Sequence, residues 1–475
     1  MIEVSLAWVA EQVKGEIRGA EQLALTPENI IIDSVSTDTR TITPNSLFIA
    51  LVGPNFNAHQ FLDTAKQQAV AAIVSEEVET DLICIKVADT REALGLLAAA
   101  VKKEVAPKTV GITGSCGKTT VKEMVASVLS QRGSVLATKG NFNNEIGVPL
   151  TLLELEREHE FAVVEMGANH LGEIDYTSGL AEPDVATIVN ADAAHLEGFG
   201  SLLGVARAKS EIFNHIPSSG TAIINADSKF SDYWLGKLHD SETLTFSNKP
   251  DNAGADYYPS DVELDMDGCP AFSLNTPQGS VFVHLPLPGI HNVGNALVSA
   301  ALAQGVGASL ENIKMGLENM AQVQGRLNIK KLTNQVRILD DTYNANIASV
   351  NAAIDVLATF PGRKIVVLGD MGELGEKARY YHEKVGEYAL QKQVDRFYSL
   401  GVLSQHASAA FENKGGHFTE VARLIEQMVT DLASEQCDIS ILVKGSRSAR
   451  MELVVQAMEE SPLGKFERIR ERIAC

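Results

Sequence analysis

The 475-residue sequence lacks three features, and each absence argues against a class of protein. No run approaches the ~20 apolar residues that a membrane-spanning helix needs. The five cysteines are scattered and form no CxxC pair, which argues against a disulfide framework and a thiolate zinc site. Basic residues are in deficit, at 40 Lys and Arg against 61 Asp and Glu, so we expect no nucleic-acid partner. The N-terminus has no basic start before an apolar run, so we expect no signal peptide and a cytoplasmic location.

The sequence does contain the mixture of 45% hydrophobic and 21% charged residues that is typical of globular domains with apolar cores. Its 475 residues are about three times the ~150 residues expected of one domain, so we predict two or three domains. Changes of pattern along the chain predict an α/β protein with a small N-terminal α/β domain over residues 1–88, a central parallel-sheet domain over 89–326 and a C-terminal Rossmann-like domain over 327–475.

Short Val- and Ile-rich runs alternate with helical segments, as expected of parallel strands that are covered on both faces. The expected strands are 30–35, 46–52, 82–87, 110–113, 161–166, 185–190, 221–225, 336–339, 364–368, 396–400 and 439–443. The expected helices are 61–73, 89–104, 118–131, 349–359, 382–392, 421–432 and 451–459.

The strongest local signal is a glycine-containing loop between an apolar strand and a helix. It consists of Gly114, Ser115, Cys116, Gly117, Lys118, Thr119 and Thr120. Backbone N–H groups, a helix N-terminus and a lysine favour a bound phosphate, and the Thr119 hydroxyl can reach Mg²⁺. The loop is shorter than a full Walker A motif, because Ile112 occupies the place of the first glycine. The strand, the lysine and the hydroxyl all have the positions that a phosphate site requires, so a phosphate site is a better interpretation than a plain helix-capping turn.

Two further side chains follow strands of the same predicted sheet. Glu165 ends an apolar strand, where the ligands of open α/β sheets collect and where a carboxylate would complete a metal–nucleotide site. His195 follows the next strand. Taken alone, each has a structural alternative, since a carboxylate at a strand end often caps a loop and a single histidine often only packs.

The order of these motifs resembles that of the Mur ligase family, whose members form amide bonds with ATP in peptidoglycan precursor synthesis. The segments that carry the resemblance are 113–119, 139–147, 165–167, 195–198, 288–292, 295–296 and 325–326. Three more segments, 340–346, 368–371 and 443–447, resemble the branch of the family that adds a D-alanyl-D-alanine dipeptide. The resemblance spans essentially the whole chain.

The resemblance implies an ATP-dependent ligase that joins D-alanyl-D-alanine to UDP-N-acetylmuramoyl-tripeptide. The γ-phosphate of ATP would pass to the terminal carboxylate of the tripeptide, and the dipeptide amine would attack the resulting acyl phosphate. ADP and phosphate would be released. The N-terminal domain would bind the UDP precursor. Independently of the resemblance, we take a monomer as the default oligomeric state. The sequence does not tell whether the third peptide residue is diaminopimelate or lysine.

The resemblance also assigns the residues of the site. Catalytic roles fall to Lys118, Lys209 and His195, and two Mg²⁺ ions would be held by Thr119, Glu165, His195 and Lys209. Lys209 would be carbamylated, because a carbamate supplies the oxygen donors for a hard cation that an ammonium lacks. ATP would contact residues 114–120 together with His291, Asn292, Asn295, Arg326, Asp341 and Tyr343. The two other substrates would contact Ser36, Thr37, Asp38, Thr39, Arg40, Asn143, Asn144, Asn344, Asn346, Lys444 and Ser446.

The chain departs from the family pattern at two places. Asn57-Ala58-His59 stands where Asp-Gly-His is usual, which puts a UDP contact there in doubt. Ile347 stands where a proline is usual, so the fixed φ of proline is absent from that loop. We also expect Cys116, beside a lysine at a helix N-terminus, to have a lowered pKa and to react with alkylating reagents unless ATP protects it.

Two alternative functions remain. Another ligase of the family, such as a diaminopimelate-adding or polyglutamate-adding enzyme, is disfavoured by segment 343–346 and by the absence of a D-N-P-R motif. A P-loop NTPase switch or a non-catalytic nucleotide-binding module would leave Lys209, His195 and the second α/β domain without a role.

Overall fold

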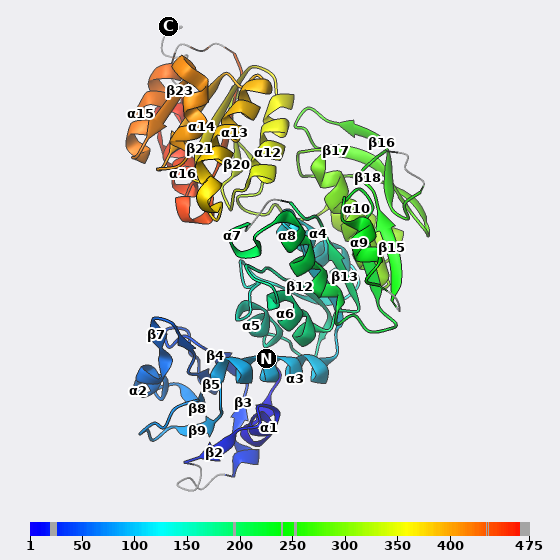
Figure 1. Ribbon diagram of the computed structural model, residues 1–475, viewed down its shortest axis with the longest axis vertical. Helices are drawn as coiled ribbons and strands as arrows, with labels where there is room; N and C mark the ends of the chain where they lie inside the picture. The colour runs from blue at the N-terminus through cyan, green and yellow to red at the C-terminus, as the bar shows by residue number, and fades with distance from the viewer. Residues whose placement is uncertain are drawn as a thin grey trace.

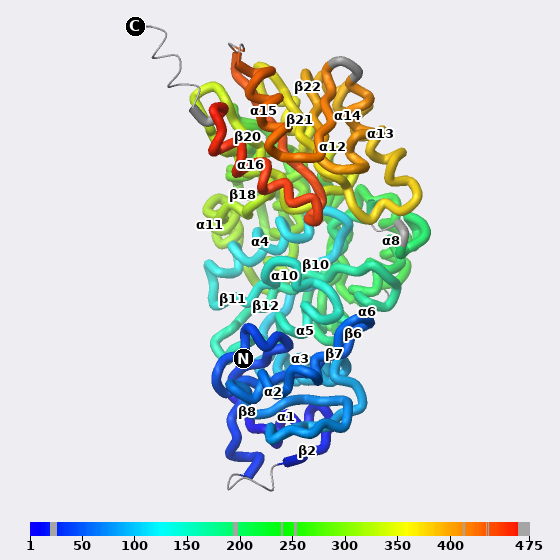
Figure 2. The backbone as a smooth tube through the Cα atoms, turned by 90° about the vertical axis from the view of Figure 1, so that its left-hand side faces the viewer, coloured from blue at the N-terminus to red at the C-terminus, as the bar shows by residue number. Residues whose placement is uncertain are grey.

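The computed structural model describes residues 1–19, 26–192, 196–238, 241–250, 254–433, 435 and 437–465. These residues form α/β bodies that follow one another along the long axis, with the N-terminal body at one end and the C-terminal body at the other (Figures 1 and 2). Within the described ranges, no helix is both long and apolar enough to cross a membrane.

The N-terminal body is built on a five-stranded sheet in the order β2-β9-β8-β5-β4, which is parallel except between β2 and β9. In that order the strands are Glu16–Arg18, Ile83–Lys86, Ala69–Val74, Ser46–Ile49 and Ser34–Ser36. The expected strand 30–35 is divided, because β3 (Ile31–Ile32) leaves this sheet and pairs with β1 (Val4–Ser5), which precedes α1 (Leu6–Gln12).

The helix expected over residues 61–73 is wrong. The structure has a short helix α2 (Leu62–Ala65) followed by the central strand β8. The sequence of β8, AVAAIV, is apolar throughout and contains three β-branched residues, which suits a strand covered on both faces. Five of its six residues are buried, so burial in the sheet decides the conformation of this segment.

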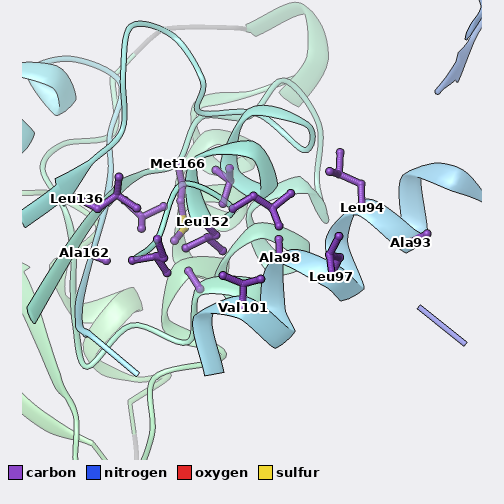
Figure 3. Close-up of a cluster of buried hydrophobic side chains, with 14 of the residues drawn as sticks. Ala93, Leu94, Leu97, Ala98, Val101, Leu136, Leu152, Ala162 and Met166 are labelled. Atoms are coloured by element: carbon purple, nitrogen blue, oxygen red, sulfur yellow. The ribbon is translucent and has the colours of Figure 1, made fainter. Parts of the chain in front are cut away.

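Helix α3 (Thr90–Val105) joins the N-terminal body to the central body. It begins at the N-cap Asp89, whose side chain accepts hydrogen bonds from two backbone N–H groups, and it ends at Ala106 in the left-handed region with φ of 52°. Figure 3 shows its apolar face packed beside strands and a helix of the central body. The buried residues labelled there are Ala93, Leu94, Leu97, Ala98, Val101, Leu136, Leu152, Ala162 and Met166.

The central sheet is six-stranded and parallel, in the order β11-β12-β10-β13-β14-β15. In that order the strands are Ser134–Ala137, His159–Glu165, Lys108–Thr113, Val185–Ile188, Thr221–Asn225 and Glu242–Phe246. Helices cover both faces: α4 (Lys118–Leu129), α10 (His291–Gly305) and α11 (Leu310–Glu318) on one, and α3, α5 (Gly147–Leu152), α6 (Glu173–Ala181) and α8 (Leu202–Ser210) on the other. The chain runs from β10 to β11 on one side of the sheet and from the adjacent strand β13 to β14 on the other. The loop after β10 therefore lies at the topological switch point where ligands of such sheets bind.

The sequence did not predict the antiparallel sheet of β16 (Tyr258–Leu264), β17 (Pro270–Thr276) and β18 (Gly279–His284). Its inner residues join the same apolar cluster as α10, and it lies at the side of the central body in Figure 1. This sheet therefore supports the helix whose N-terminus begins at His291.

The C-terminal body has a six-stranded sheet in the order β19-β20-β24-β21-β22-β23, parallel except between β19 and β20. In that order the strands are Asn328–Lys331, Val336–Asp341, Ile439–Lys444, Arg363–Gly369, Arg396–Leu400 and Gly415–Phe418. The helices α12 (Ile347–Thr359), α13 (Ala378–Gln391) and α14 (Gln405–Ser408) pack on one face, and α15 (Val421–Leu432) and α16 (Glu452–Glu460) on the other. The expected three-part α/β plan with parallel sheets is thus confirmed.

Candidate active site

The predicted phosphate loop lies between the end of β10 and the start of α4. Asn190, just after β13, braces it: its side chain accepts from the Cys116 N–H at 2.8 Å and donates to the Cys116 carbonyl at 3.1 Å. Gly117 has φ of 79°, and a Cβ there would lie 2.9 Å from Asn295 Oδ1. The loop therefore needs glycine at this position, both for its backbone conformation and for the close approach of α10.

Two side chains of the loop are bonded to protein groups. Lys118 Nζ donates to the Gly114 carbonyl at 2.8 Å. The Thr119 hydroxyl accepts from Arg326 Nη2 at 3.1 Å. These are the ammonium and the hydroxyl that a bound nucleotide and its metal would engage, so binding would exchange these contacts for ligand contacts.

Glu165 ends β12 beside this loop, in the position that the sequence predicts. Its Oε1 accepts from Asn143 Nδ2 at 2.8 Å, so Asn143, an expected substrate residue, contacts the carboxylate here. Its Oε2 is buried and has no hydrogen-bond partner among the described residues. An orphaned, buried carboxylate oxygen beside a phosphate loop suits a hard cation such as Mg²⁺.

Lys209, in the last turn of α8, is 2% exposed. Burial, and after it the charge of the nearby Lys118, lower the pKa of its ammonium to about 7. Its amine is therefore neutral and nucleophilic for a large part of the time at neutral pH.

The structure describes some, but not all, of the metal ligands expected from the sequence. Across the described residues, no cluster of three or more His, Cys, Asp and Glu side chains forms a metal site. A Mg²⁺ held by few carboxylates, by waters and by substrate phosphates is compatible with this, because Mg²⁺ keeps most of its own shell. His195 lies outside the described residues.

A cavity of about 340 Å³ opens between the phosphate loop, the N-terminus of α10 and the C-terminal body. His291, Asn292 and Asn295 line it from α10. Asn292 Nδ2 donates to the Pro288 carbonyl, and Asn295 Nδ2 donates to Asn292 Oδ1, each at 2.8 Å. The three residues of α10 that are expected to contact ATP are thus brought together at one side of the cavity.

The C-terminal body supplies the facing wall of this cavity. Asp341 ends β20 and pairs with Lys444, which ends β24 and also donates to the Asn344 carbonyl at 2.9 Å. Asp341 and Lys444 line the cavity beside the residues of α10. Lys444, an expected substrate residue, is therefore a structural partner of Asp341.

Arg326 connects the two walls. Besides its hydrogen bond to Thr119, its guanidinium carbon lies 4.4 Å from the centre of the Tyr343 ring. Gly325 precedes it with φ of 70°, in the left-handed region. Arg326, which is expected to contact ATP, thus contacts both the phosphate loop and the C-terminal body, as a planar cation over an aromatic ring can do.

Asn346 makes a second connection between the two bodies. It is the N-cap of α12, in a capping box with Ser349, and its side-chain amide lies 3.1 Å from Cys116 Sγ. Ile347 is the first helical residue, where a proline would also fit, so the cap and not a proline sets the start of the helix.

The expected low pKa of Cys116 is wrong. Burial against the C-terminal body raises the pKa of this thiol, and the opposing effects of Asn346 and Lys118 are smaller. The sequence argument counted the helix N-terminus and the lysine, and it could not include the desolvation that the neighbouring body imposes.

The expected uridine segment lies in the N-terminal body and is not brought to the phosphate loop (Figure 1). Ser36 ends β4, and its hydroxyl donates to the Asp38 carbonyl at 2.8 Å. Arg40 hydrogen-bonds the Asp38 carboxylate and lowers its pKa to about 2. Thr37 and Thr39 belong to the same turn.

Asn57, which stands where the family pattern has an aspartate, contacts neighbouring side chains. Asn57 Oδ1 accepts from His59, and its Nδ2 donates to Glu76 Oε1 at 2.9 Å. The other ring nitrogen of His59 accepts from the Ser75 N–H at 2.9 Å. An aspartate at 57 would set two carboxylates side by side, so Asn57 and Glu76 fit each other, and both ring nitrogens of His59 are hydrogen-bonded within the N-terminal body.

The remaining expected substrate residues lie at the edges of the site. Asn144 caps the start of α5 through the Gly147 N–H at 2.8 Å, and the Ser446 hydroxyl donates to the Asp370 carbonyl at 2.6 Å. The structure adds cavity residues that the sequence analysis missed, namely Asn190, Asp192, Asn225, Phe246 and Asn248. Asn190 and Asn225 end or follow predicted strands at the ligand edge of the sheet, and that position was the available signal.

Comparison with known proteins accounts for this arrangement. Residues 112–303 match the Mur ligase middle domain, and residues 325–447 match the Mur ligase, glutamate ligase domain. The chain is 46% identical over 462 residues to the UDP-N-acetylmuramoyl-tripeptide–D-alanyl-D-alanine ligase of Escherichia coli K12, covering 97% of this chain and 99% of that protein. The chain belongs to the Mur ligase family. It is an ATP-dependent ligase.

Two solved structures show that this Mur ligase is similar to its relatives in fold as well as in sequence. A UDP-N-acetylmuramoylalanyl-D-glutamyl-2,6-diaminopimelate–D-alanyl-D-alanyl ligase from Acinetobacter baumannii is 36% identical with a TM-score of 0.87, over 97% of this chain and 99% of that one. A MurF ligase from Thermotoga maritima in complex with ADP is 28% identical with a TM-score of 0.79, over 92% and 98%.

Proposed function

We propose that this Mur ligase joins D-alanyl-D-alanine to UDP-N-acetylmuramoyl-tripeptide in peptidoglycan precursor synthesis, releasing ADP and phosphate. The observation that carries the proposal is the likeness to ligases of that name over nearly the full length of both chains. The site geometry supports it, because a phosphate loop, a carboxylate oxygen with no partner among the described residues and a buried lysine face one region of the central sheet.

The reaction begins with two anions, and the chain must bring them together. The loop amides and Lys118 hold the triphosphate and offset the charge that develops when the γ-phosphate passes to the tripeptide carboxylate. Arg326 reaches the same phosphates from the hinge. The amine of D-alanyl-D-alanine then attacks the acyl phosphate, the C–N bond forms, and phosphate leaves from the tetrahedral carbon.

The C-terminal body closes one side of the cavity. Asp341 and Tyr343 face the nucleotide, and the dipeptide enters near Asn344, Asn346 and the loop around Ser446. Such a split site excludes water when the bodies close, and this protects an acyl phosphate from hydrolysis.

Two Mg²⁺ ions would supply charge neutralisation and orient the phosphates. Thr119 and Glu165 would hold one ion, and His195 with Lys209 would contribute to the second. The neutral Lys209 amine would add CO₂, forming an N–C bond and releasing a proton, to give a carbamate. The burial of Lys209 and the lowered pKa of its ammonium support this step.

The UDP precursor would bind the N-terminal body through Ser36, Thr37, Asp38, Thr39 and Arg40, and reach the central site past Asn143 and Asn144. We take diaminopimelate as the third peptide residue, as in the name of the A. baumannii relative. We place the domain divisions after residues 88 and 326, and propose a monomer that works in the cytoplasm.

The test is phosphate release with the two substrates supplied together and separately. We expect release, and a UDP-muramoyl-pentapeptide product by mass spectrometry, only when UDP-muramoyl-tripeptide and D-alanyl-D-alanine are both present with ATP and Mg²⁺. Phosphate release at the same rate with and without the dipeptide would indicate an NTPase. Product with free diaminopimelate and the dipeptide precursor would indicate another ligase of the family.

A further inference from the structure

A second cavity, of about 460 Å³, lies away from the phosphate loop, between the start of α3 and the start of α6. Its charged lining is mixed and mostly acidic, and Tyr176 forms part of its wall. The Tyr176 hydroxyl is buried against Gly95 of α3 and has no hydrogen-bond partner among the described residues. No role assigned above uses this cavity.

Some of its charges are occupied by the protein itself. Asp89 caps α3 by accepting two backbone N–H groups. Glu173 accepts from the Asn169 N–H at 2.8 Å and lies 2.9 Å from His170 Nδ1. These hydrogen bonds hold the walls of the cavity in place.

Arg91 and Glu145 differ from Asp89 and Glu173 in how their charged groups are paired. The nearest atoms of their charged groups, Nη1 and Oε1, are 3.9 Å apart, and neither side chain has a hydrogen bond within the described part of the chain. Both are partly exposed, at 45% and 31%. A cation and an anion held side by side but not bonded can receive a ligand that carries the complementary pair, with its carboxylate on the guanidinium and its ammonium on the carboxylate.

The cavity is close to the acceptor side of the proposed reaction. Glu145 follows Asn143 by two residues, a span of at most ~7 Å, and Asn143 binds Glu165. The Gly167 N–H donates to the Asn143 carbonyl at 2.7 Å, which holds the loop that leads to His170 against the same segment. The cavity and the residue that binds Glu165 therefore share one loop, which leads from Glu165 toward Arg91 and Glu145.

We propose that Arg91 and Glu145 bind the free α-amino-carboxylate end of a diaminopimelate residue in the tripeptide substrate, and so select it over lysine. Diaminopimelate carries this zwitterion three methylene groups from the carbon that bears the reacting carboxylate, whereas lysine ends in an ammonium alone. Arg91 is the selecting residue because only diaminopimelate offers a carboxylate to it. The inference depends on the proposed function and adds the subsite for the third residue.

The experiment measures kcat/KM for the diaminopimelate and the lysine tripeptide with the full chain. We expect the wild type to favour the diaminopimelate substrate at least about tenfold, and Arg91→Gln to lower that ratio about tenfold through KM. Arg91→Glu should invert the preference, since it repels the carboxylate and attracts the ammonium. Arg157→Gln is the matched control, because Arg157 has a similarly loose ion pair, 3.6 Å from Glu104, outside the cavity.

A wild-type preference for lysine would overturn the inference, as would a ratio that Arg91→Gln and Arg91→Glu leave unchanged. Equal losses with both substrates would also overturn it, since they indicate a general structural role. A wild type that is inactive with both tripeptides would overturn the proposed function itself. Thermal unfolding of each variant separates a loss of fold from a loss of binding.

Discussion

The two sides of the central site differ in how their polar groups are paired. On the nucleotide side, Lys118, Thr119 and Asn295 each have a protein partner at 2.8 to 3.1 Å. On the carboxylate side, Glu165 Oε2 is buried without a partner among the described residues, and Lys209 is buried beside another lysine. A ligand on the first side replaces existing contacts, whereas a ligand on the second side satisfies groups that burial has left in an unfavourable state. Substitutions on the carboxylate side should therefore affect turnover more.

The largest effect is expected at Lys209. Lys209→Ala removes the proposed carbamate, and kcat should fall about 10³-fold, in the range seen when a preorganised electrostatic group is lost. Added acetate or propionate should restore part of the activity by occupying the vacated space with a carboxylate. Lys249→Ala, an exposed lysine of the same body, is the control. Full activity of Lys209→Ala without any added carboxylate would remove Lys209 from the mechanism.

Glu165→Gln should rank next, with kcat lowered about 10²-fold. Glutamine keeps the shape and the contact with Asn143 but loses the negative charge, so the Mg²⁺ concentration at half-maximal activity should rise. A titration of phosphate release against Mg²⁺ measures both quantities. An unchanged Mg²⁺ dependence would show that Glu165 serves only to position Asn143.

Features that local sequence defines were predictable, and features that depend on contacts between distant segments were not. The loop 114–120 and Glu165 could be predicted because strand-end position and local chemistry define them. The C-terminal contributions of Arg326 and Asp341 required the family resemblance, since no local pattern brings segments 200 residues apart together. The β8 segment was misassigned because a helix-compatible alanine run and a buried strand share one composition, and only pairing in the sheet distinguishes them. The raised pKa of Cys116 depends on burial, which a local sequence pattern does not show, and this burial outweighs the hydrogen bond from Asn346 that lowers the pKa.

A smaller effect is expected on the nucleotide side, at Arg326. Arg326→Lys keeps the charge but loses the planar contact with Tyr343 and the geometry of the bond to Thr119, so KM for ATP should rise about tenfold while kcat changes less. Initial rates at varied ATP concentration measure this. A loss in kcat as large as that of Glu165→Gln would contradict the contrast between the two sides, and would place Arg326 with the reacting groups.

The smallest effect concerns Cys116, whose thiol lies where the nucleotide side meets the C-terminal body. Since burial raises its pKa, little thiolate exists at pH 7 to 8, and alkylation should be slower than at the exposed Cys437 and should accelerate as the pH rises. Peptide mass spectrometry after iodoacetamide treatment gives the two rates. Cys437 in the same sample is the internal control. Faster labelling of Cys116 than of Cys437 in the unliganded enzyme would mean that the two bodies separate in solution and expose the loop.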